Sequence, residues 1–209
     1  MSTATLYVPK KNEKFVGYIS TFQDNIEANV KLSSSEIYND QHQVINAFNW
    51  KSYLPFASKE ALGWFTFSFN EKPFFITHYE LRQRHDYSNS YIREWAFEGS
   101  NDNISWRILD KEFNVPGFAA LNESRLFEIK RKGSFKYFRL RSLYKDVYLA
   151  VKAIEVYGFF CENEFICDPP YSYQKTIRCR SRNIPVLSYS LMIMLSTYSW
   201  TMNLIKTLK

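Results

Sequence analysis

Cysteine is scarce in this chain and unevenly placed. There are 3 cysteines among 209 residues, at Cys161, Cys167 and Cys179, so no disulfide can join the two ends of the preceding body. Zinc sites need about four closely spaced ligands, and these intervals do not provide them. The start of the chain also lacks a basic segment followed by an apolar run, the usual mark of a secretory signal. These absences lead us to expect a cytoplasmic protein.

Histidine and glycine are almost as rare, and their scarcity argues against several kinds of chemistry. The chain has 3 histidines and 6 unclustered glycines, so no glycine-rich loop can cradle a phosphate. We identify neither a nucleophile with an adjacent base nor a serine in a glycine-flanked turn. The carboxylates Glu36, Asp40 and Glu60 show no tight ligand spacing for calcium. We therefore expect no catalytic residue, no metal and no cofactor.

Aromatic residues, in contrast, are abundant. They make up 18% of the chain, and broad rings favour the half-buried faces of β-sheets. A hydrophobic content of 45% is typical of a protein with a buried core. The formal net charge is +6, but half of this excess lies after residue 160, and no concentrated basic stripe is present for nucleic acid. The composition predicts one β-rich domain that does not bind nucleic acid.

Alternation of apolar and polar residues predicts that most of the chain is β-strand. Within residues 64–69, Phe65, Phe67 and Phe69 fall on one face. Residues 74–82 continue the alternation after a short turn, and we expect these two strands to pair as a hairpin. Further short runs separated by turn residues are typical of a sandwich or barrel. These runs lie at 94–98, 105–109, 126–130, 135–141 and 152–157.

Helical signals are few. Apolar residues recur at helical spacing within 14–22, and a single further turn is predicted at 43–48. After Gly158 the strand pattern stops. We therefore divide the chain into a lead-in (1–28), a β-domain (29–160) and a basic and apolar tail (161–209).

The tail has a different character from the rest of the chain. The Pro169-Pro170 pair prevents a continuous helix at that point. Residues 183–205 carry no formal charge and have basic residues on both sides, a layout that resembles a tail anchor. Serine and threonine within the segment weaken its tendency to insert into a bilayer. Three alternatives stay open for 183–205: a membrane span, a helix packed on the body or on a partner, and a poorly ordered apolar tail.

Residues 95–109 read WAFEGSNDNISWRIL, a sequence typical of two strands joined by a tight turn. Asn and Asp tolerate left-handed backbone angles and bond their own backbone, so Asp102 and Asn103 can reverse the chain. We expect Trp95 and Trp106 to pack near each other across this hairpin. We interpret the motif as a structural element and not as a ligand contact.

The order of these motifs resembles a known family. WAFEGSNDNISWRILD (95–110), FKYFRLR (135–141) and YLAVKAIEVYG (148–158) follow one another as in the coagulation-factor type C (F5/8 type C) or discoidin domain. The resemblance covers residues 29–158 and includes the intracellular BTB-linked and protist members. It implies an all-β fold, a galactose-binding-like jelly-roll β-sandwich with a short N-terminal helical lead-in and an irregular or helical C-terminal tail. It also implies that loops at one end bind the ligand.

Three loops would form that end, at 33–60, 82–91 and 142–148. Aromatic rings beside hydrogen-bonding and basic groups suit a sugar, a protein hot spot or a lipid headgroup. In the first loop, Trp50, Tyr53 and Phe56 could be exposed anchors, and Trp50 could instead be a core residue. In the second loop, three donors could clamp a carboxylate or a pair of hydroxyls, or the loop could hold an internal arginine–aspartate pair. The predicted ligand-binding residues are Tyr53, Arg82, Arg84, His85, Tyr87 and Lys145.

These features predict a non-catalytic binding module that recognises a protein partner or a carbohydrate through loops at one end of a β-sandwich. Two alternatives stay open. The first is a membrane-associated adhesion or scaffold protein, tethered through 183–205. The second is an accessory carbohydrate-binding domain of a glycosidase.

Overall fold

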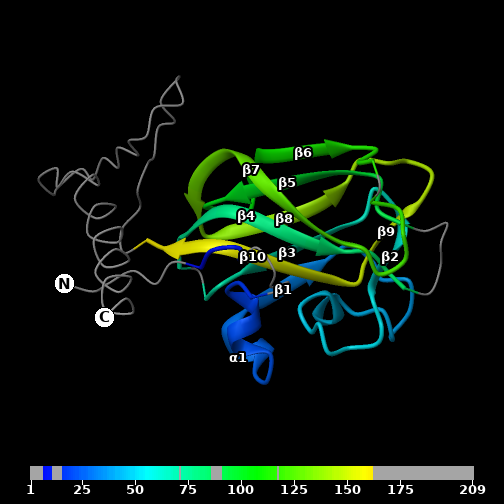
Figure 1. The fold of residues 1–209 in the computed structure, drawn as a ribbon, viewed down its shortest axis with the longest axis horizontal. Coiled ribbons are helices and arrows are strands. Elements are labelled where there is room, and N and C mark those ends of the chain that lie inside the picture. Colours follow the sequence, from blue (N-terminus) through cyan, green and yellow to red (C-terminus); the bar gives the residue numbers. More distant parts are fainter. Residues whose placement is uncertain (1–6, 11–15, 71, 86–90, 117, 162–209) are drawn as a thin grey trace, which may run out of the picture. The chain divides into compact units, whose positions relative to one another are not determined.

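The computed structural model describes residues 7–10, 16–70, 72–85, 91–116 and 118–161, and Figure 1 shows its ribbon. All of them belong to the first of two compact units, Met1–Glu162. No helix within the described ranges has the length and apolar character needed to cross a membrane. The tail segment on which the membrane alternative depends lies outside the described residues.

Antiparallel strands make up most of the described chain, which confirms the predicted all-β sandwich. Within the described residues, helix is limited to two 3-10 turns, η1 (Ile19–Phe22) and η2 (Val44–Ala47), and one short α-helix, α1 (Ile26–Asn29). The strands are β1 (Lys31–Ser34), β2 (Phe56–Ala61), β3 (Trp64–Ser68), β4 (Phe74–Arg82), β5 (Glu94–Ser100), β6 (Arg107–Phe113), β7 (Ser124–Phe135), β8 (Tyr137–Ser142), β9 (Tyr148–Val151) and β10 (Ala153–Phe160).

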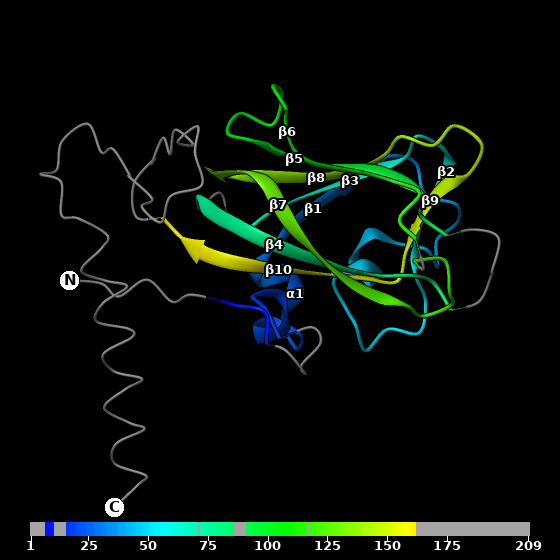
Figure 2. The same cartoon turned by 45° about the horizontal axis from the view of Figure 1, so that its top comes forward.

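The strands form two facing layers and one short ribbon. A five-stranded sheet has the order β1-β3-β8-β5-β6, and a three-stranded sheet has the order β10-β4-β7. Strands β2 and β9 pair separately. Figure 2 shows β5 and β8 in one layer and β4 and β10 in the other. Side chains that alternate along each strand therefore point either into the space between the layers or outward.

The expected hairpin between the strands at 64–69 and 74–82 is wrong. Strand β3 pairs with β1 and β8, whereas β4 pairs with β10 and β7. The turn after Phe69 carries the chain from one sheet to the other, and the Phe69 and Phe74 rings meet across the core with centroids 5.4 Å apart. Alternation reveals which face of a strand is buried, but it does not identify the strand's partner.

Aromatic rings fill the space between the sheets. Phe67 stacks on Phe138 at 5.4 Å, and Tyr79 stacks on Phe97 at 4.5 Å. The Tyr79 hydroxyl donates a 2.7 Å hydrogen bond to Asp110 Oδ2 and accepts one of 2.9 Å from Trp95 Nε1. Burial raises the pKa of Tyr79 well above its ordinary value. This neutral hydroxyl therefore joins the two sheets without leaving a buried polar atom unsatisfied.

The 95–109 motif forms the predicted hairpin between β5 and β6. Asn103 has a φ of 60°, and Asp102 Oδ1 accepts hydrogen bonds from the backbone N–H groups of Ile104 and Ser105. These bonds hold the pKa of Asp102 well below its usual range. The expected contact between the two tryptophans of the motif is wrong, because one lies in the core against Phe118 and Phe127, and the other lies outside the sheet.

The residues around that second tryptophan explain its position. Trp106 precedes β6 and lies 4.3 Å from the Arg139 guanidinium, which donates a 2.6 Å hydrogen bond to Glu98. Arg141 binds the same carboxylate from the next outward position of β8. Strand β8 therefore buries Phe138 and Leu140 on one face and pairs Arg139 and Arg141 with a carboxylate on the other.

The lead-in is packed into the same core as the strands. Ile19, Phe22 and Ile26 belong to the main hydrophobic cluster, and the blue lead-in lies beside β10 in Figures 1 and 2. The buried Glu155 carboxylate of β10 accepts the backbone N–H groups of Ile19 at 2.7 Å and Ser20 at 2.9 Å. This side chain therefore holds the N-terminal segment against the edge of the three-stranded sheet.

The edge of β10 is covered by further backbone contacts. Tyr7 exchanges hydrogen bonds of 2.8 and 2.9 Å with Gly158, and Tyr18 donates one to the Val156 carbonyl. Gly158 lies at a bulge with φ 153°, where a Cβ atom would be 1.9 Å from the Phe75 carbonyl oxygen. Only glycine fits this position, and the lead-in then shields an otherwise open sheet edge.

We predict that Glu155 makes the stability of the protein depend on pH. Burial raises the pKa of Glu155 from 4.5 to about 7. Between these values the folded state holds a proton that the unfolded state has released, so the free energy of unfolding falls as pH rises. A pKa change of this size corresponds to about 3 kcal/mol. Urea unfolding between pH 4 and pH 8 should show this loss in the wild type and not in Glu155→Gln.

The matched control for this prediction is Glu27→Gln, which changes an exposed carboxylate in the same lead-in. Its pH profile should follow that of the wild type. If Glu155→Gln also follows the wild type, Glu155 does not titrate in this range and the prediction is wrong.

Candidate functional site

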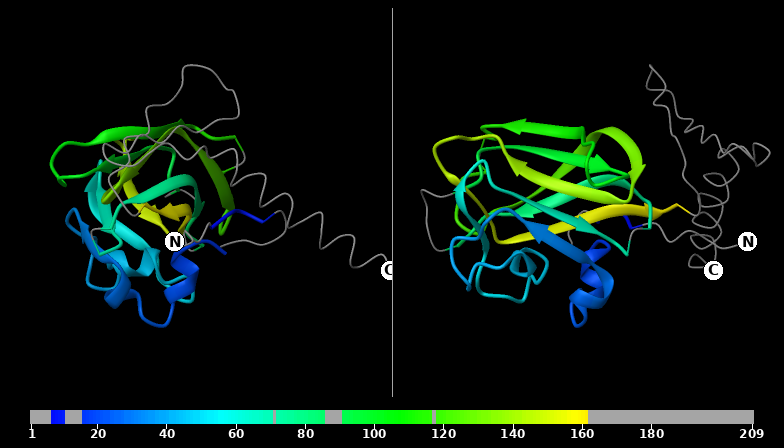
Figure 3. Two further views of the ribbon diagram at one scale, coloured as in Figure 1. Left: turned by 90° about the vertical axis from the view of Figure 1, so that its left-hand side faces the viewer. Right: turned by 180° about the vertical axis from the view of Figure 1, so that it is seen from behind.

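The three predicted loops lie at one end of the sandwich. Backbone hydrogen bonds join the strands there, from Lys152 to Arg82 at 3.0 Å and from Leu143 to Glu94 at 2.9 Å. The long connection from β1 to β2 and the short turn from β2 to β3 also lie at this end. Figure 3 shows these loops at the end away from the last residues of β10. We call this region the loop end.

Two predicted ligand-binding residues meet at the loop end. The Tyr53 side chain is 74% exposed, and its ring lies against His85 with centroids 4.3 Å apart and planes at 69°. Both ring nitrogens of His85 are buried and have no hydrogen-bond partner among the described residues. An imidazole carries at least one N–H donor, so a buried ring with no partner has a real energetic cost.

Arg84 is not the exposed donor that the sequence suggested. It is 2% exposed, and its Nη1 donates a 2.9 Å hydrogen bond to the Tyr148 hydroxyl. Its guanidinium carbon also lies 5.8 Å from the centroid of the Tyr148 ring. Arg84 therefore supports the site from beneath and fixes the first residue of β9. Arg84 is buried because the backbone after β4 directs its side chain beneath the loops and not toward solvent.

The other predicted site residues are placed differently. Arg82 Nε donates to Ser124 Oγ of β7 at 3.0 Å, and burial lowers the pKa of Arg82. Lys145 is exposed on the β8–β9 loop. Tyr87 lies outside the described residues. The structure thus brings Tyr53, His85 and Arg84 together, directs Arg82 toward the three-stranded sheet, and leaves Lys145 on a neighbouring loop.

Two tyrosines complete the cluster and were not predicted. Tyr38 is 57% exposed and stacks on Tyr148 with centroids 5.9 Å apart and planes at 24°. Both residues lie in loops of the predicted site, and loop position was the only available signal. Of the two uncertain aromatic residues in the first loop, Phe56 is fully buried and Trp50 is half-buried. Only Tyr53 is an exposed anchor among the three.

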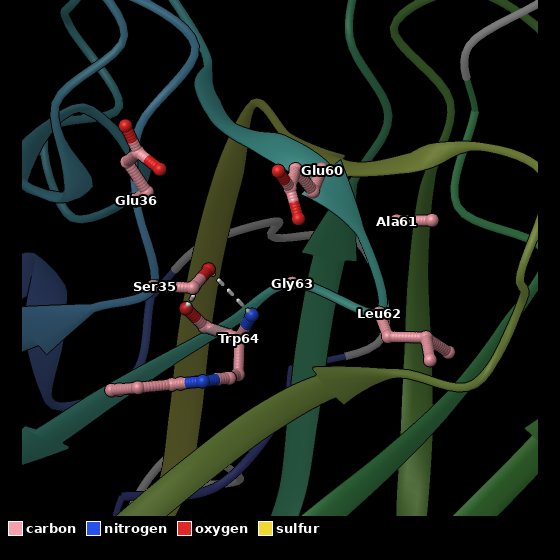
Figure 4. A pocket seen from close by; sticks show the side chains of 7 residues that line it. All are labelled: Ser35, Glu36, Glu60, Ala61, Leu62, Gly63 and Trp64. Carbon is pink, nitrogen blue, oxygen red and sulfur yellow. Dashed lines mark hydrogen bonds between the residues drawn. The ribbon is translucent and has the colours of Figure 1, made fainter.

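A small pocket lies beside this cluster, at the β2–β3 turn (Figure 4). It has a volume of about 120 Å³ and is lined by Ser35, Glu36, Glu60, Ala61, Leu62, Gly63 and Trp64. Figure 4 shows the two glutamates near the hydrogen bonds that join the Ser35 hydroxyl to the Trp64 backbone. A Cβ atom at Gly63 would be 2.1 Å from Ser58 Oγ, so the turn requires glycine.

The pocket is acidic but shallow. Glu36 and Glu60 both line it, and Glu36 forms a 2.5 Å ion pair with Lys59. No group of three or more His, Cys, Asp or Glu side chains in the described part of the chain is arranged to hold a metal ion. Pockets that enclose a small ligand usually measure at least about 300 Å³. A sugar ring therefore does not fit inside.

Comparison with known proteins identifies the fold. No protein-family model and no curated protein matches this sequence. Among solved structures, a CBM32 module from Clostridium perfringens, in complex with GalNAc-β-1,3-galactose, matches with a TM-score of 0.55 and 13% identity, over 63% of this chain and 96% of that chain. An F5/8 type C domain from Bacteroides fragilis matches with a TM-score of 0.54 and 15% identity, over 63% and 93%.

A third structure agrees with these two. The family 32 carbohydrate-binding module of C. perfringens NanJ, in complex with galactose, matches with a TM-score of 0.52 and 9% identity, over 62% of this chain and 94% of that chain. Identities this low establish a common fold and not a common ligand. The chain therefore has the galactose-binding-like β-sandwich fold of F5/8 type C domains and family 32 carbohydrate-binding modules.

Proposed function

We propose that this protein is a non-catalytic module that binds carbohydrate at the loop end. The observation that carries the proposal is the contact between an exposed tyrosine ring and a half-buried histidine whose two buried ring nitrogens have no hydrogen-bond partner in the described part of the chain. Tyr53 offers an aromatic surface to solvent, and His85 holds a donor and an acceptor directly beside it. This combination favours a ligand that has both an apolar face and hydroxyl groups.

The energetics of His85 support a ligand contact over a purely structural role. A histidine that served only to stabilise the loop would be expected to hydrogen-bond to a neighbouring carbonyl or side chain. Sugar hydroxyls both donate and accept, so a small shift of Tyr53 would let one sugar satisfy either ring nitrogen. The exposed face of Tyr53 would then pack on the apolar face of the same ring. Arg84 and Tyr148 hold the platform in place beneath it.

The chemistry of the loop end favours binding over catalysis. The paired carboxylates of many glycosidases flank a sugar held in a cleft. Here Glu36 and Glu60 border a pocket that is too small for a sugar ring, and Glu36 is paired with Lys59. The sugar-bound modules that share this fold support the choice of carbohydrate over a protein partner. Galactose and galactose-containing glycans are therefore the first probes to use.

We predict that Tyr53→Ala abolishes the strongest signals on a glycan array and weakens binding at least about tenfold in calorimetry, because an exposed ring anchor contributes 1 to 3 kcal/mol; tenfold corresponds to about 1.4 kcal/mol. The matched control is Ile104→Ala, which removes an 82% exposed apolar side chain from the β5–β6 turn at the opposite end. Ile104→Ala should bind as the wild type does. A wild-type protein that binds no glycan on the array would overturn the proposal, and a protein partner would become the better explanation.

His85→Phe gives a sharper test, because it keeps a ring against Tyr53 and removes both nitrogens. We predict that this variant unfolds at the same urea concentration as the wild type or at a higher one, since two unsatisfied polar atoms are lost. Its affinity for glycans should fall at least about tenfold. A variant that is clearly destabilised and still binds normally would show that His85 is structural.

A further inference from the structure

Tyr38 forms a second exposed aromatic platform at the loop end, separate from Tyr53. It lies on the segment between β1 and η2, and its backbone N–H donates a 2.9 Å hydrogen bond to Ala57 of β2. The ring stacks on Tyr148 and also contacts the edge of His42, with centroids 5.6 Å apart. These contacts fix the ring although it is 57% exposed. An exposed tyrosine that is held in one position loses little further entropy when a ligand binds.

The two platforms are joined by an unbroken series of contacts. Tyr38 stacks on Tyr148 at 5.9 Å, Tyr148 lies 5.8 Å from the Arg84 guanidinium, and the next residue, His85, contacts Tyr53 at 4.3 Å. Three of these steps are ring-to-ring or ring-to-guanidinium contacts of normal length, and the step from Arg84 to His85 is the backbone between them. The loop end therefore presents two exposed tyrosines connected through the buried Arg84, and we call this series the aromatic ridge.

Each end of the ridge combines a ring with hydrogen-bonding groups. At the Tyr53 end the groups are the ring nitrogens of His85. At the Tyr38 end they are the side chains that follow in sequence, where Asn39 and Gln41 are exposed. Asn39 Oδ1 accepts a 3.0 Å bond from the Gln41 backbone and lies 2.7 Å from His42 Nδ1, which orders this turn. Amide groups can donate to and accept from sugar hydroxyls.

We propose that Tyr38 and Tyr148 form a second sugar subsite, so that the ligand is an oligosaccharide that extends along the ridge and not a single sugar. This inference rests on the proposed function and specifies in addition that the carbohydrate is long enough to contact both tyrosines. Each platform alone is open and shallow. A chain that contacts both gains the second contact intramolecularly, which multiplies the affinity of the first.

The test is calorimetric titration with galactose, β-1,4-galactobiose and β-1,4-galactotetraose. The wild type should bind the tetraose at least about tenfold more tightly than galactose. In Tyr38→Ala this gain should fall below about threefold while the affinity for galactose stays unchanged. Tyr38→Phe, which keeps the ring, should retain the gain. Tyr53→Ala should weaken all of the sugars that bind.

Three results would overturn the inference. In the first, the wild type binds the three sugars equally or binds none of them. In the second, Tyr38→Ala retains the full gain with chain length. In the third, Tyr38→Ala weakens galactose as much as galactotetraose, which would place Tyr38 in the first subsite. The glycan array tests the proposed function separately. If the wild type binds glycans on the array but has the same affinity for galactose, galactobiose and galactotetraose, only the second subsite is contradicted.

Discussion

The fold depends on aromatic rings that pack between two antiparallel sheets. The Tyr79 and Phe97 rings link strands of different sheets, and the Phe67 and Phe138 rings stack between the paired strands β3 and β8. A fully buried ring of this kind contributes roughly 1.5 to 3 kcal/mol, and many are present. This packing holds the body together, and Cys161 is the one cysteine among the described residues. The same packing fixes the strand ends from which the loops project.

Buried polar side chains in the core and at the loop end differ in whether they have hydrogen-bond partners. Inside, the Tyr79 hydroxyl has both a donor and an acceptor, Trp95 and Asp110, at good distances. At the loop end, His85 keeps two buried nitrogens without partners in the described chain. A rigid scaffold can maintain such an unfavourable arrangement because the surrounding packing determines the backbone there. The arrangement becomes favourable only when something supplies hydrogen bonds, which is the property expected of a binding site.

Much of the fold could be predicted from the sequence, because the alternation of apolar and polar residues within each strand shows which of its faces is buried. The two-residue alternation of Phe65, Phe67 and Phe69 locates a strand and its buried face without any other information. It could not show that the neighbouring strand belongs to the opposite sheet, since both strands bury one face in the same core. Likewise Trp95 and Trp106 look equivalent in the hairpin sequence, but only the register shows that one is central and the other peripheral.

The candidate site was only partly predictable, for a related reason. Loop position indicated Tyr53 and His85, and the structure shows that their rings contact each other across two loops. It also indicated Arg84, whose charge suggested exposure, but the guanidinium is turned inward and bonds the Tyr148 hydroxyl. Tyr38 and Tyr148 are separated by more than one hundred positions and become neighbours only when β2 pairs with β9. Contacts that depend on strand pairing cannot be predicted from local sequence patterns.

Two buried carboxylates away from the site are stabilised by different kinds of hydrogen-bond donor. Glu98 lies between Arg139 and Arg141, and the guanidinium groups stay charged at any ordinary pH. Glu155 instead relies on backbone N–H groups, which do not offset the full cost of its burial, and its pKa rises to about 7. Protonation of Glu155 therefore acts on the lead-in and the edge of β10. The lead-in is in turn bonded to the loop that carries Tyr53, because Gln23 Nε2 donates a 2.8 Å hydrogen bond to the Phe48 carbonyl and Gln23 Oε1 accepts one of 3.1 Å from the Trp50 backbone N–H. The segment that Glu155 holds therefore also supports one end of the aromatic ridge.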